Sequence, residues 1–539
     1  MQQPRHLHFL FASLLSAGIL TLAWQPYGLV FTAFIGFVPL LWIEQKIREQ
    51  QRATAWLLLY AFFAFALWNA GSTWWIKNAS VEGAWMAVLL NSSLMCLPVI
   101  LYHRLQFRMQ QQDAQRAFIL LWITFEYGHF NWEATWPWLA LGNVFSSMPE
   151  LVQWYEYTGV FGGSLWILLV NVYIFRYLMK WEERSAPERY TKGFNLVFFY
   201  VFAPAFLSWY IASDLRITGK NLQVVVVQPN IDPYKDKFSG MSPLEQTRKM
   251  LELAEKTVDS STQLVCFPET ALVGSLREDD LGNYETIALL RQFILAHPQL
   301  VILSGADTYR FYENQETLSK TARLYRDNIY YDAYNTALLI NNFSNEIQIY
   351  HKSILVPGVE RLPYADKIGF IKKLTVDLGG TSGSLGCDST SKVLYIGQSN
   401  HDNRSVAPVI CYESVFGEYV ASYVKKGAGL IAIITNDGWW GNTPGYRQHF
   451  DYARLRAIET RRYVARAANT GISGFIDPKG NVLSKSEWWT ADALKHTVIL
   501  NTAETFYVKY GDWLGLTAAG LSILTLVVNW KRKRDPVND

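Results

Sequence analysis

Long apolar runs fill the first two-fifths of the chain and recur once near its C-terminus. Crossing a membrane as a helix takes roughly 20 residues, and apolar runs, most of them long enough, lie near residues 8–24, 27–43, 55–76, 84–102, 117–127 with its neighbours, 157–175, 194–211 and 513–530. The fifth run is the weakest, because Glu126, His129 and Glu133 interrupt it. The first run lacks a small-residue cleavage site, which favours a retained anchor over a signal peptide. The pattern predicts a multi-pass bundle of about eight transmembrane helices.

Positive charges give the predicted bundle an orientation. With a cytoplasmic N-terminus, the three inside loops and the tail 531–534 carry fifteen Lys and Arg residues, whereas the short outside loops carry only Lys77. Cytoplasmic loops of membrane proteins are enriched in Lys and Arg. Because seven spans precede the long segment between the seventh and eighth runs, we expect that segment to be extracytoplasmic.

The pattern changes between about residues 215 and 510. Short apolar runs of strand length alternate there with amphipathic stretches, and the predicted strands are Leu222–Val227, Leu264–Phe267, Leu300–Leu303, Thr336–Ile340, Val393–Ile396, Val406–Ile410, Leu430–Ile434 and Ile472–Ile476. The predicted helices are Pro243–Thr257, Glu285–Ala296, Ser414–Lys426 and Tyr446–Ala468. This alternation is typical of an α/β domain with buried strands.

Three regions therefore follow from the pattern: a membrane bundle over residues 1–214, an α/β domain over 215–510, and a last span with a basic tail over 511–539. Within the α/β domain, Val359–Val376 has no clear periodicity, and we expect it to form a lid over a site.

Composition supports a membrane protein. Half of the residues are hydrophobic, only 18% are charged, and the aromatic content is 15%; aromatic side chains collect at membrane–water interfaces. A net charge of +3 with no basic aromatic patch argues against nucleic-acid binding. The four cysteines are widely spaced, without CxxC or His/Cys ligand spacing. We therefore expect no metal site, no disulfide framework and no cofactor.

Candidate chemistry lies at three strand ends of the α/β domain. Cys411 ends the apolar run Val406–Ile410, Glu269 follows Leu264–Phe267, and Lys352 follows the run that ends at His351. Reactive groups gather at the carboxyl ends of strands in α/β sheets. A thiol, a carboxylate and an ammonium together provide a nucleophile, its base and a cation for an oxyanion.

Each of these residues also has a simpler interpretation. A cysteine is often a small buried hydrophobe, an acid near a helix start is often a cap, and a lysine at a strand end is often solvated. Cys387, after a glycine-rich loop, is the one rival for a reactive thiol, whereas Cys96 and Cys266 fit packing roles. His449 fits a structural role better than that of a triad histidine.

Several motifs resemble one family. Glu269 in CFPETA, Lys352 in YHKSILVPGVE and Cys411 in VICYES resemble the Glu-Lys-Cys triad of the nitrilase superfamily, in that order. The block Asn436–Gly480, the PWLALG segment after Trp136 and Gln228-Pro-Asn-Ile231 resemble the apolipoprotein N-acyltransferases, the membrane-embedded branch of that superfamily. The resemblance covers essentially the whole chain and implies a nitrilase-like αββα sandwich joined to the bundle.

The resemblance implies a role for each matching residue. Cys411 would be the nucleophile, Glu269 the general base and acid, and Lys352 the oxyanion stabiliser. The implied supporting residues are Glu360, Tyr412, Glu413, Phe238 and Trp439. The implied reaction moves an acyl chain from a membrane phospholipid, typically phosphatidylethanolamine, through a Cys thioester to the α-amine of a diacylglyceryl-cysteine on an apolipoprotein. The implied location is the bacterial inner membrane, with the catalytic domain in the periplasm and the chain acting as a monomer.

The chain departs from the family pattern at three points. The glycine of the Leu355–Glu360 segment is displaced, a Trp expected after the Gln228 motif is replaced by Tyr234 or Phe238, and an Arg expected after Glu126 is absent. Two alternatives stay open: a membrane-tethered carbon–nitrogen hydrolase that uses the same triad with water, and a receptor or transporter whose α/β domain only binds ligand. The transporter ranks last, because its spans would carry more ionisable groups.

Overall fold

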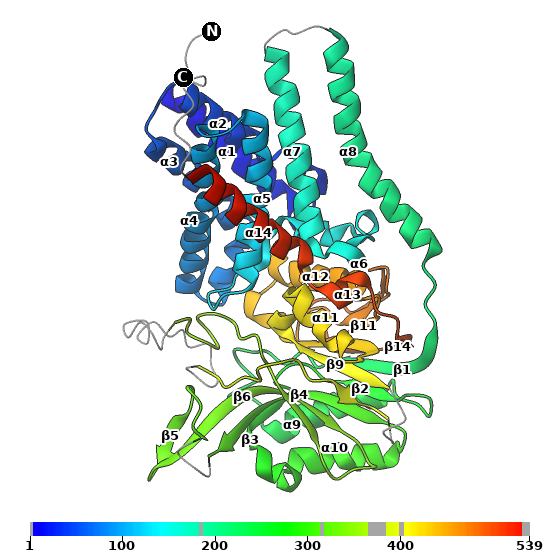
Figure 1. Ribbon diagram of the computed structural model, residues 1–539. Helices are drawn as coiled ribbons and strands as arrows, with labels where there is room; N and C mark the ends of the chain where they lie inside the picture. Colours follow the sequence, from blue (N-terminus) through cyan, green and yellow to red (C-terminus); the bar gives the residue numbers. More distant parts are fainter. Residues whose placement is uncertain (1–3, 183–186, 313–316, 365–383, 398–403, 531–539) are drawn as a thin grey trace. The chain divides into compact units, whose positions relative to one another are not determined.

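The computed structural model describes residues 4–182, 187–312, 317–364, 384–397 and 404–530 (Figure 1). The chain forms two compact units. A helical unit comprises residues 1–77, 81–214 and 510–539, and an α/β unit comprises residues 78–80 and 215–509. Most of the predicted lid, 365–376, lies outside the described residues.

The helical unit is built from α-helices, which are long except for one of four residues. They are α1 (His6–Ala23), α2 (Val38–Glu49), α3 (Thr54–Thr73), α4 (Val81–Gln106), α5 (Gln111–Phe130), α6 (Tyr155–Thr158), α7 (Val160–Glu182), α8 (Pro187–Asp214) and α14 (Trp513–Trp530). Within the described residues, seven helical stretches are long and apolar enough to cross a membrane. They coincide with seven of the eight predicted runs. The exception is α5, the run with the interrupting acids; its crossing stays a prediction.

The C-terminal helix α14 returns to the helical unit and packs on α5. The hydroxyl oxygens of Thr124 and Ser522 lie 2.9 Å apart, and a Cβ at Gly515 would lie 2.6 Å from the ring of Tyr127. Glycine at this position is thus required for the two helices to approach so closely. The chain therefore leaves this unit after α8 and re-enters it as a packed member of the bundle.

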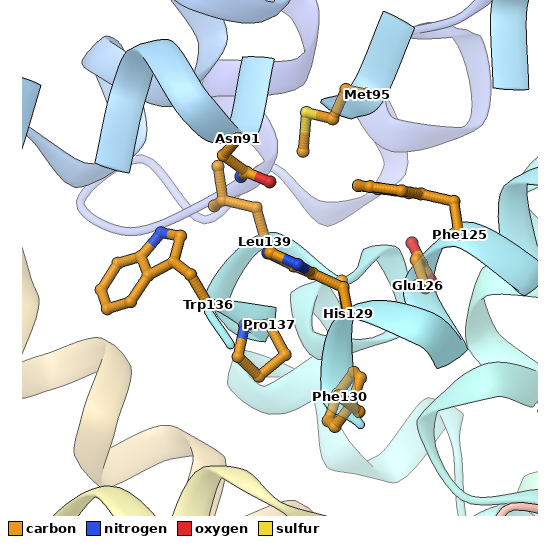
Figure 2. A pocket seen from close by; sticks show the side chains of 10 residues that line it. Asn91, Met95, Phe125, Glu126, His129, Phe130, Trp136, Pro137 and Leu139 are labelled. Atoms are coloured by element: carbon orange, nitrogen blue, oxygen red, sulfur yellow. The ribbon is translucent and has the colours of Figure 1, made fainter. Parts of the chain in front are cut away.

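Helix α5 carries a buried carboxylate, Glu126. It accepts hydrogen bonds from Trp122 Nε1 at 2.9 Å, from the Leu141 amide at 2.8 Å and from Ser164 Oγ at 2.5 Å. These donors are neutral, as expected where no water can solvate a polar group. A small cavity beside it is shown in Figure 2 and is lined by Asn91, Met95, Phe125, Glu126, His129, Phe130, Trp136, Pro137, Leu139 and Ala140.

The α/β unit contains two sheets. The eight-stranded sheet has the order β14-β1-β2-β4-β6-β5, with β3 on β4 and β7 on β6; its strands are β1 (Gly219–Gln228), β2 (Leu264–Cys266), β3 (Leu272–Arg277), β4 (Val301–Phe311), β5 (Arg323–Arg326), β6 (Ile329–Ile340), β7 (Gln348–His351) and β14 (Asp492–Asn501). The six-stranded sheet has the order β13-β12-β11-β10-β9-β8; its strands are β8 (Leu394–Tyr395), β9 (Ser405–Ile410), β10 (Leu430–Thr435), β11 (Val464–Ala468), β12 (Gly474–Ile476) and β13 (Val482–Lys485).

Helices cover the outer face of each sheet, giving the expected αββα sandwich. Figure 1 shows α9 (Pro243–Glu255) and α10 (Glu285–Ala296) against the eight-stranded sheet, and α11 (Gly417–Lys425) and α12 (Pro444–Thr460) against the other. The short helix α13 (Phe506–Tyr510) follows β14. Strand β1 shows why its apolar run is continuous: Val224 and Val226 pack between the sheets, whereas Val225 and Val227 pack under α9 and α10. Successive side chains of a strand point to opposite faces, so both faces need apolar residues.

Two predicted helices have the wrong extent. Helix α12 ends at Thr460, not at Ala468; Arg461 adopts φ +50°, and the chain continues as strand β11. Every residue of β11 is buried, so the strand shows no alternation of polar and apolar residues. The sequence pattern therefore did not separate it from the preceding helix. The predicted helix Ser414–Lys426 is a 3₁₀ turn, Cys411–Val415, followed by α11. Strands β3, β5, β11, β13 and β14 were not predicted.

Candidate active site

Cys411 lies at a strained turn at the end of β9. Its φ is +49°, in the left-handed region that costs a residue with a Cβ about 1–2 kcal/mol. The neighbouring parallel strand β10 is in register with β9, with Ile434 paired to Ile410. The carboxyl end of β10 therefore lies beside Cys411, and the Thr435 hydroxyl interacts with the thiol. Strain of this kind at a reactive side chain is typical of a nucleophile on a sharp strand-to-helix turn.

Glu269 comes from the other sheet, three residues beyond the end of β2. Its Oε2 accepts a hydrogen bond from the backbone N of Asn436 at 3.1 Å, which joins the turn after β2 to the turn after β10. A Cβ at Gly305 on β4 would lie 2.7 Å from the Cα of Glu269, so β4 can approach this turn only because residue 305 is glycine. Glu269 caps no helix, since strand β3 follows.

Lys352 follows β7 and is buried rather than solvated, with a side chain 1% exposed. Its Nζ lies 3.1 Å from Glu269 Oε1 and 2.8 Å from Glu360 Oε1. Asn335 on β6 links the same two carboxylates, because its Nδ2 donates to Glu269 Oε1 at 2.8 Å and to Glu360 Oε1 at 3.0 Å. Glu269, Lys352 and Glu360, which sequence reasoning singled out separately, thus form one buried cluster.

The displaced glycine is accommodated in the loop between Lys352 and Glu360. Gly358 adopts φ +82°, and its backbone N donates to Arg361 O at 2.7 Å. The Val356 backbone N then donates to Glu360 Oε2 at 2.8 Å. The loop therefore returns the Glu360 carboxylate to Lys352 although the motif differs from the family pattern.

Charges within the cluster determine where the protons lie. Burial alone would raise the pKa of Glu269, but the Lys352 ammonium and the Asn335 hydrogen bond hold it below its ordinary value. Burial would lower the pKa of Lys352, but the carboxylates of Glu269 and Glu360 raise it well above its ordinary value. Burial raises the pKa of the Cys411 thiol, the Glu269 carboxylate raises it further, and Lys352 only partly offsets both. The resting site thus holds a neutral thiol beside an ionised carboxylate and an ammonium.

The other cysteines lie in different surroundings. Cys266 is fully buried in the core between the sheets, and burial alone raises its pKa. Cys96 is buried within α4, and Cys387 is exposed. The Glu269 and Lys352 charges act on Cys411, which distinguishes it from its rivals.

Tyr412 and Glu413, expected beside the nucleophile, are both buried. Glu413 accepts hydrogen bonds from Tyr350 Oη at 2.5 Å, from the Ser353 backbone N at 2.7 Å and from the Ile410 backbone N at 2.8 Å. These bonds tie the end of β9 to the segment that carries Lys352. Burial raises the pKa of Glu413 to about 7, and its hydrogen bonds only partly offset this shift. Its contacts fit a residue that holds the site together; its role in a pocket stays a prediction.

Phe238 and Trp439 stack with ring centroids 6.4 Å apart. Tyr234 packs edge-on against Trp439 at 5.3 Å, so both aromatic residues near the Gln228 motif contact the same ring. Phe238 is 39% exposed. These rings form an apolar surface next to Lys237, whose charge acts on both Glu269 and Cys411.

Sequence reasoning missed several residues of the site. Lys237 is buried and donates from Nζ to the Glu269 carbonyl oxygen at 3.0 Å and to the Thr270 hydroxyl. Burial lowers the pKa of Lys237 to about 8, although Asp307 and Glu269 act against this shift. Asn335 and Asn436 hold the Glu269 carboxylate. In the sequence, Asn335 and Asn436 could have been recognised only as polar residues inside, or directly after, an apolar strand.

Two family profiles match different parts of the chain. The profile described as carbon–nitrogen hydrolase matches residues 223–507, and the one described as apolipoprotein N-acyltransferase N-terminal domain matches residues 16–173. The chain belongs to the carbon–nitrogen hydrolase family. The first match covers the α/β sandwich except for the first residues of β1, and the second covers helices α2 to α6 with parts of α1 and α7.

Relatives of similar length align along almost the whole chain. A protein of Chlorobaculum tepidum named apolipoprotein N-acyltransferase is 28% identical over 527 residues, covering 96% of this chain and 95% of the relative. A protein of Geobacter metallireducens with the same name is 24% identical over 532 residues, covering 97% and 95%. Among solved structures, Saccharomyces cerevisiae Nit3, a nitrilase superfamily member, aligns at 15% identity and a TM-score of 0.35, over 55% of this chain and 94% of that one.

Proposed function

We propose that this membrane protein is a phospholipid:apolipoprotein N-acyltransferase that carries a fatty acyl chain on Cys411. The observation that carries the proposal is the presence, in one chain, of Cys411 beside a buried Glu269–Lys352 ion pair and of seven apolar helices, in a protein whose full-length relatives are named apolipoprotein N-acyltransferase. Two lipid-anchored substrates meet a membrane-held enzyme at raised effective concentration. A soluble amidase has no such need.

In the first half-reaction, the acyl group moves from oxygen to sulfur. Glu269 takes the proton of the Cys411 thiol as the sulfur attacks an ester carbonyl of the phospholipid. Lys352 stabilises the negative charge on the carbonyl oxygen. The carbon–oxygen bond then breaks, the lysophospholipid alkoxide takes the proton from Glu269, and a thioester remains on Cys411. The neutral thiol and ionised Glu269 of the resting site support this direction of proton transfer.

In the second half-reaction, the acyl group moves from sulfur to nitrogen. The α-amine of the diacylglyceryl-cysteine attacks the thioester carbonyl, and Glu269 accepts a proton from that nitrogen. A carbon–nitrogen bond forms, the carbon–sulfur bond breaks, and the proton returns to Cys411. Neither step requires a cofactor or a metal ion.

The supporting residues have separate proposed roles. Glu360 shares Lys352 with Glu269 and keeps the ammonium in place. Glu413 fixes the end of β9, and Tyr412 packs edge-on against Phe416 at 5.2 Å. The stacked rings of Phe238 and Trp439 offer an apolar surface suited to an acyl chain. Phosphatidylethanolamine as donor and a monomeric state complete the proposal.

The acyl-enzyme test uses the full-length protein in detergent. Incubation with phosphatidylethanolamine that carries a labelled acyl chain is expected to add one acyl mass to the wild type and none to Cys411→Ala. Cys387→Ala, which alters an exposed thiol, is the matched control and should label normally. A diacylglyceryl lipopeptide should then remove the label as an amide. Labelling of Cys411→Ala would end the assignment of the nucleophile, whereas release of the acyl chain to water alone would favour the hydrolase.

Orientation is tested separately. We propose that the α/β unit lies in the periplasm of the bacterial inner membrane, from the distribution of Lys and Arg around the spans. A cysteine placed at exposed Lys485, with Cys387 replaced by alanine, should react with a membrane-impermeant maleimide in cells with a permeable outer membrane. Reaction only after lysis of the inner membrane would reverse the orientation.

A further inference from the structure

Behind Cys411, on the side of α12, lies a buried polar chain that the proposed reaction does not use. His449 on α12 contacts Asp437 Oδ1 with Nδ1 at 2.9 Å and Ser414 Oγ with Nε2 at 2.9 Å. Arg466 on β11 donates from Nη2 to Asp437 Oδ2 at 2.7 Å. All four side chains are at most 1% exposed. Buried polar chains of this kind fix one geometry when every member is paired.

The chain ends on the backbone of the nucleophile. Ser414 Oγ donates to the Cys411 carbonyl oxygen at 2.7 Å, and His449 Nε2 lies 3.2 Å from the same oxygen. This carbonyl belongs to the residue with φ +49°. A non-glycine residue stays in the left-handed region only when its surroundings hold it there. These contacts are therefore placed to fix the Cys411 backbone.

Ser414, His449 and Asp437 have the order of a Ser-His-Asp triad, but their surroundings exclude that function. Ser414 is 1% exposed, so no substrate carbonyl reaches its hydroxyl. The hydroxyl proton is already directed to the Cys411 carbonyl oxygen. The Asp437 carboxylate only accepts, so the Nδ1–H of His449 points to it, while Nε2 lies within hydrogen-bond distance of Ser414 Oγ and of the Cys411 carbonyl oxygen and donates to them in the imidazolium form, in which both ring nitrogens carry protons.

The Asp437 end of the chain is anchored firmly. Burial would raise the pKa of Asp437, but the charges of Arg466 and His449 hold it well below its ordinary range. Thr435 donates from Oγ1 to Asp437 Oδ1 at 3.0 Å, and a Cβ at Gly471 would lie 2.4 Å from Asp437 Oδ2. Asp437 thus has little room to move.

We propose that Ser414 and His449, anchored by Asp437 and Arg466, are positioning residues that hold the Cys411 carbonyl and thereby keep its sulfur beside Glu269 and Lys352. This inference rests on the proposed function only where acylation of Cys411 is measured. Alkylation of the Cys411 thiol tests it independently of that function. Release of the carbonyl would let residue 411 relax toward extended backbone and turn the thiol away from its base.

The test compares Ser414→Ala, His449→Leu and His449→Gln in the full-length Cys387→Ala protein. The chemical readout is the rate of Cys411 alkylation by iodoacetamide from pH 6 to 10, followed by peptide mapping. The functional readout is the rate of Cys411 acylation by phosphatidylethanolamine. Asp451→Asn is the matched control, because it removes a charge from α12 that pairs with Arg454 instead. Thermal unfolding in detergent is recorded for every variant.

We expect both rates to fall roughly three- to tenfold in Ser414→Ala, the effect of one hydrogen bond, and about a hundredfold in His449→Leu. His449→Gln keeps an N–H group near the Nε2 position and should recover much of the loss, while Asp451→Asn stays within about twofold. If His449→Leu does not fold, Ser414→Ala decides.

Equal rates in the folded variants and the control would overturn the inference, as would a His449→Gln variant no better than His449→Leu. If the wild type is never acylated while alkylation still falls in the variants, the proposed function fails and the inference stands.

Discussion

Glu126 in the helical unit and Glu269 in the α/β unit are both buried carboxylates, and they are held in different ways. Glu126 in the helical unit is held by an indole N–H, a backbone amide and a hydroxyl. Glu269 in the α/β unit is held by the Lys352 ammonium, by the side-chain amide of Asn335 and by the backbone N–H of Asn436. Neutral donors fix a side chain in place. A cation in addition supplies charge that the site can use when a substrate takes on negative charge.

The difference follows from the elements that carry each residue. Glu126 lies within one helix and finds its donors four residues earlier and in adjacent segments. Glu269 lies after a strand end, where the ends of β2, β7 and β10 bring together a carboxylate, an ammonium and a backbone N–H. Variants of the two carboxylates should therefore separate catalysis from stability.

The largest effect should come from Glu269→Gln compared with Glu126→Gln. Loss of a general base costs roughly 10²–10⁴-fold, so acylation of Cys411 by phospholipid should fall about 10³-fold in Glu269→Gln. In Glu126→Gln the rate should change less than about threefold. Intact-mass time courses measure both. Equal losses in the two variants would show that the two carboxylates do not differ in this way.

The next largest effect is expected for Lys352→Met. Removing one partner of a buried ion pair costs roughly 3–5 kcal/mol, because Glu269 and Glu360 would then face each other without a cation. Chemical denaturation in detergent should show this loss, and acylation should also fall. Lys352→Met combined with Glu360→Gln should regain part of the stability but not the activity. A single variant as stable as the wild type would contradict the cluster's electrostatics.

His351 offers a cation that pH can remove. It contacts Glu278 Oε1 at 2.7 Å and Asp388 Oδ1 at 2.9 Å; although burial acts to lower its pKa, these two carboxylates raise it to about 9. The stability it contributes, about 3 kcal/mol, should be complete below the unfolded pKa near 6.5 and lost as the pH rises through 9. Unfolding of wild type and His351→Gln should therefore differ at pH 6 and converge by pH 10. A difference that grew with pH would refute this sign.

The smallest effect should come from Glu126→Gln on stability. Two of the three donors can still bond to the Gln oxygen, whereas the Gln NH₂ group faces the third donor and cannot accept its hydrogen bond. Such a mismatch costs about 1–2 kcal/mol. The unfolding temperature in detergent should fall by a few degrees, with Ser164→Ala, which removes one donor, falling by a similar amount. A Glu126→Gln protein as stable as the wild type would mean that the three donors do not require the carboxylate.

Hydrophobic patterning predicted the general architecture, because the architecture depends mainly on which segments avoid water. The apolar runs became helices, and most continuous β-branched runs became strands buried on both faces. The boundary of α12 failed because a fully buried strand, Val464–Ala468, carries no alternation that separates it from a preceding helix. Strand β14 was missed because its mixed pattern acquires meaning only through pairing with β1, more than 260 residues earlier.

The sequence by itself indicated the candidate site residues: Cys411, Glu269 and Lys352 each follow an apolar run, and a polar group there is placed at the edge of a sheet. It also determined that part of the chain is built for a membrane, since long apolar helices have no other solvent. Only the tertiary structure decided how these groups meet. The left-handed turn at Cys411, the Asn335 link between two carboxylates and the Ser414–His449–Asp437 chain all depend on contacts between segments far apart in sequence. Such contacts follow from packing rather than from local pattern, so no single stretch of the sequence encodes them.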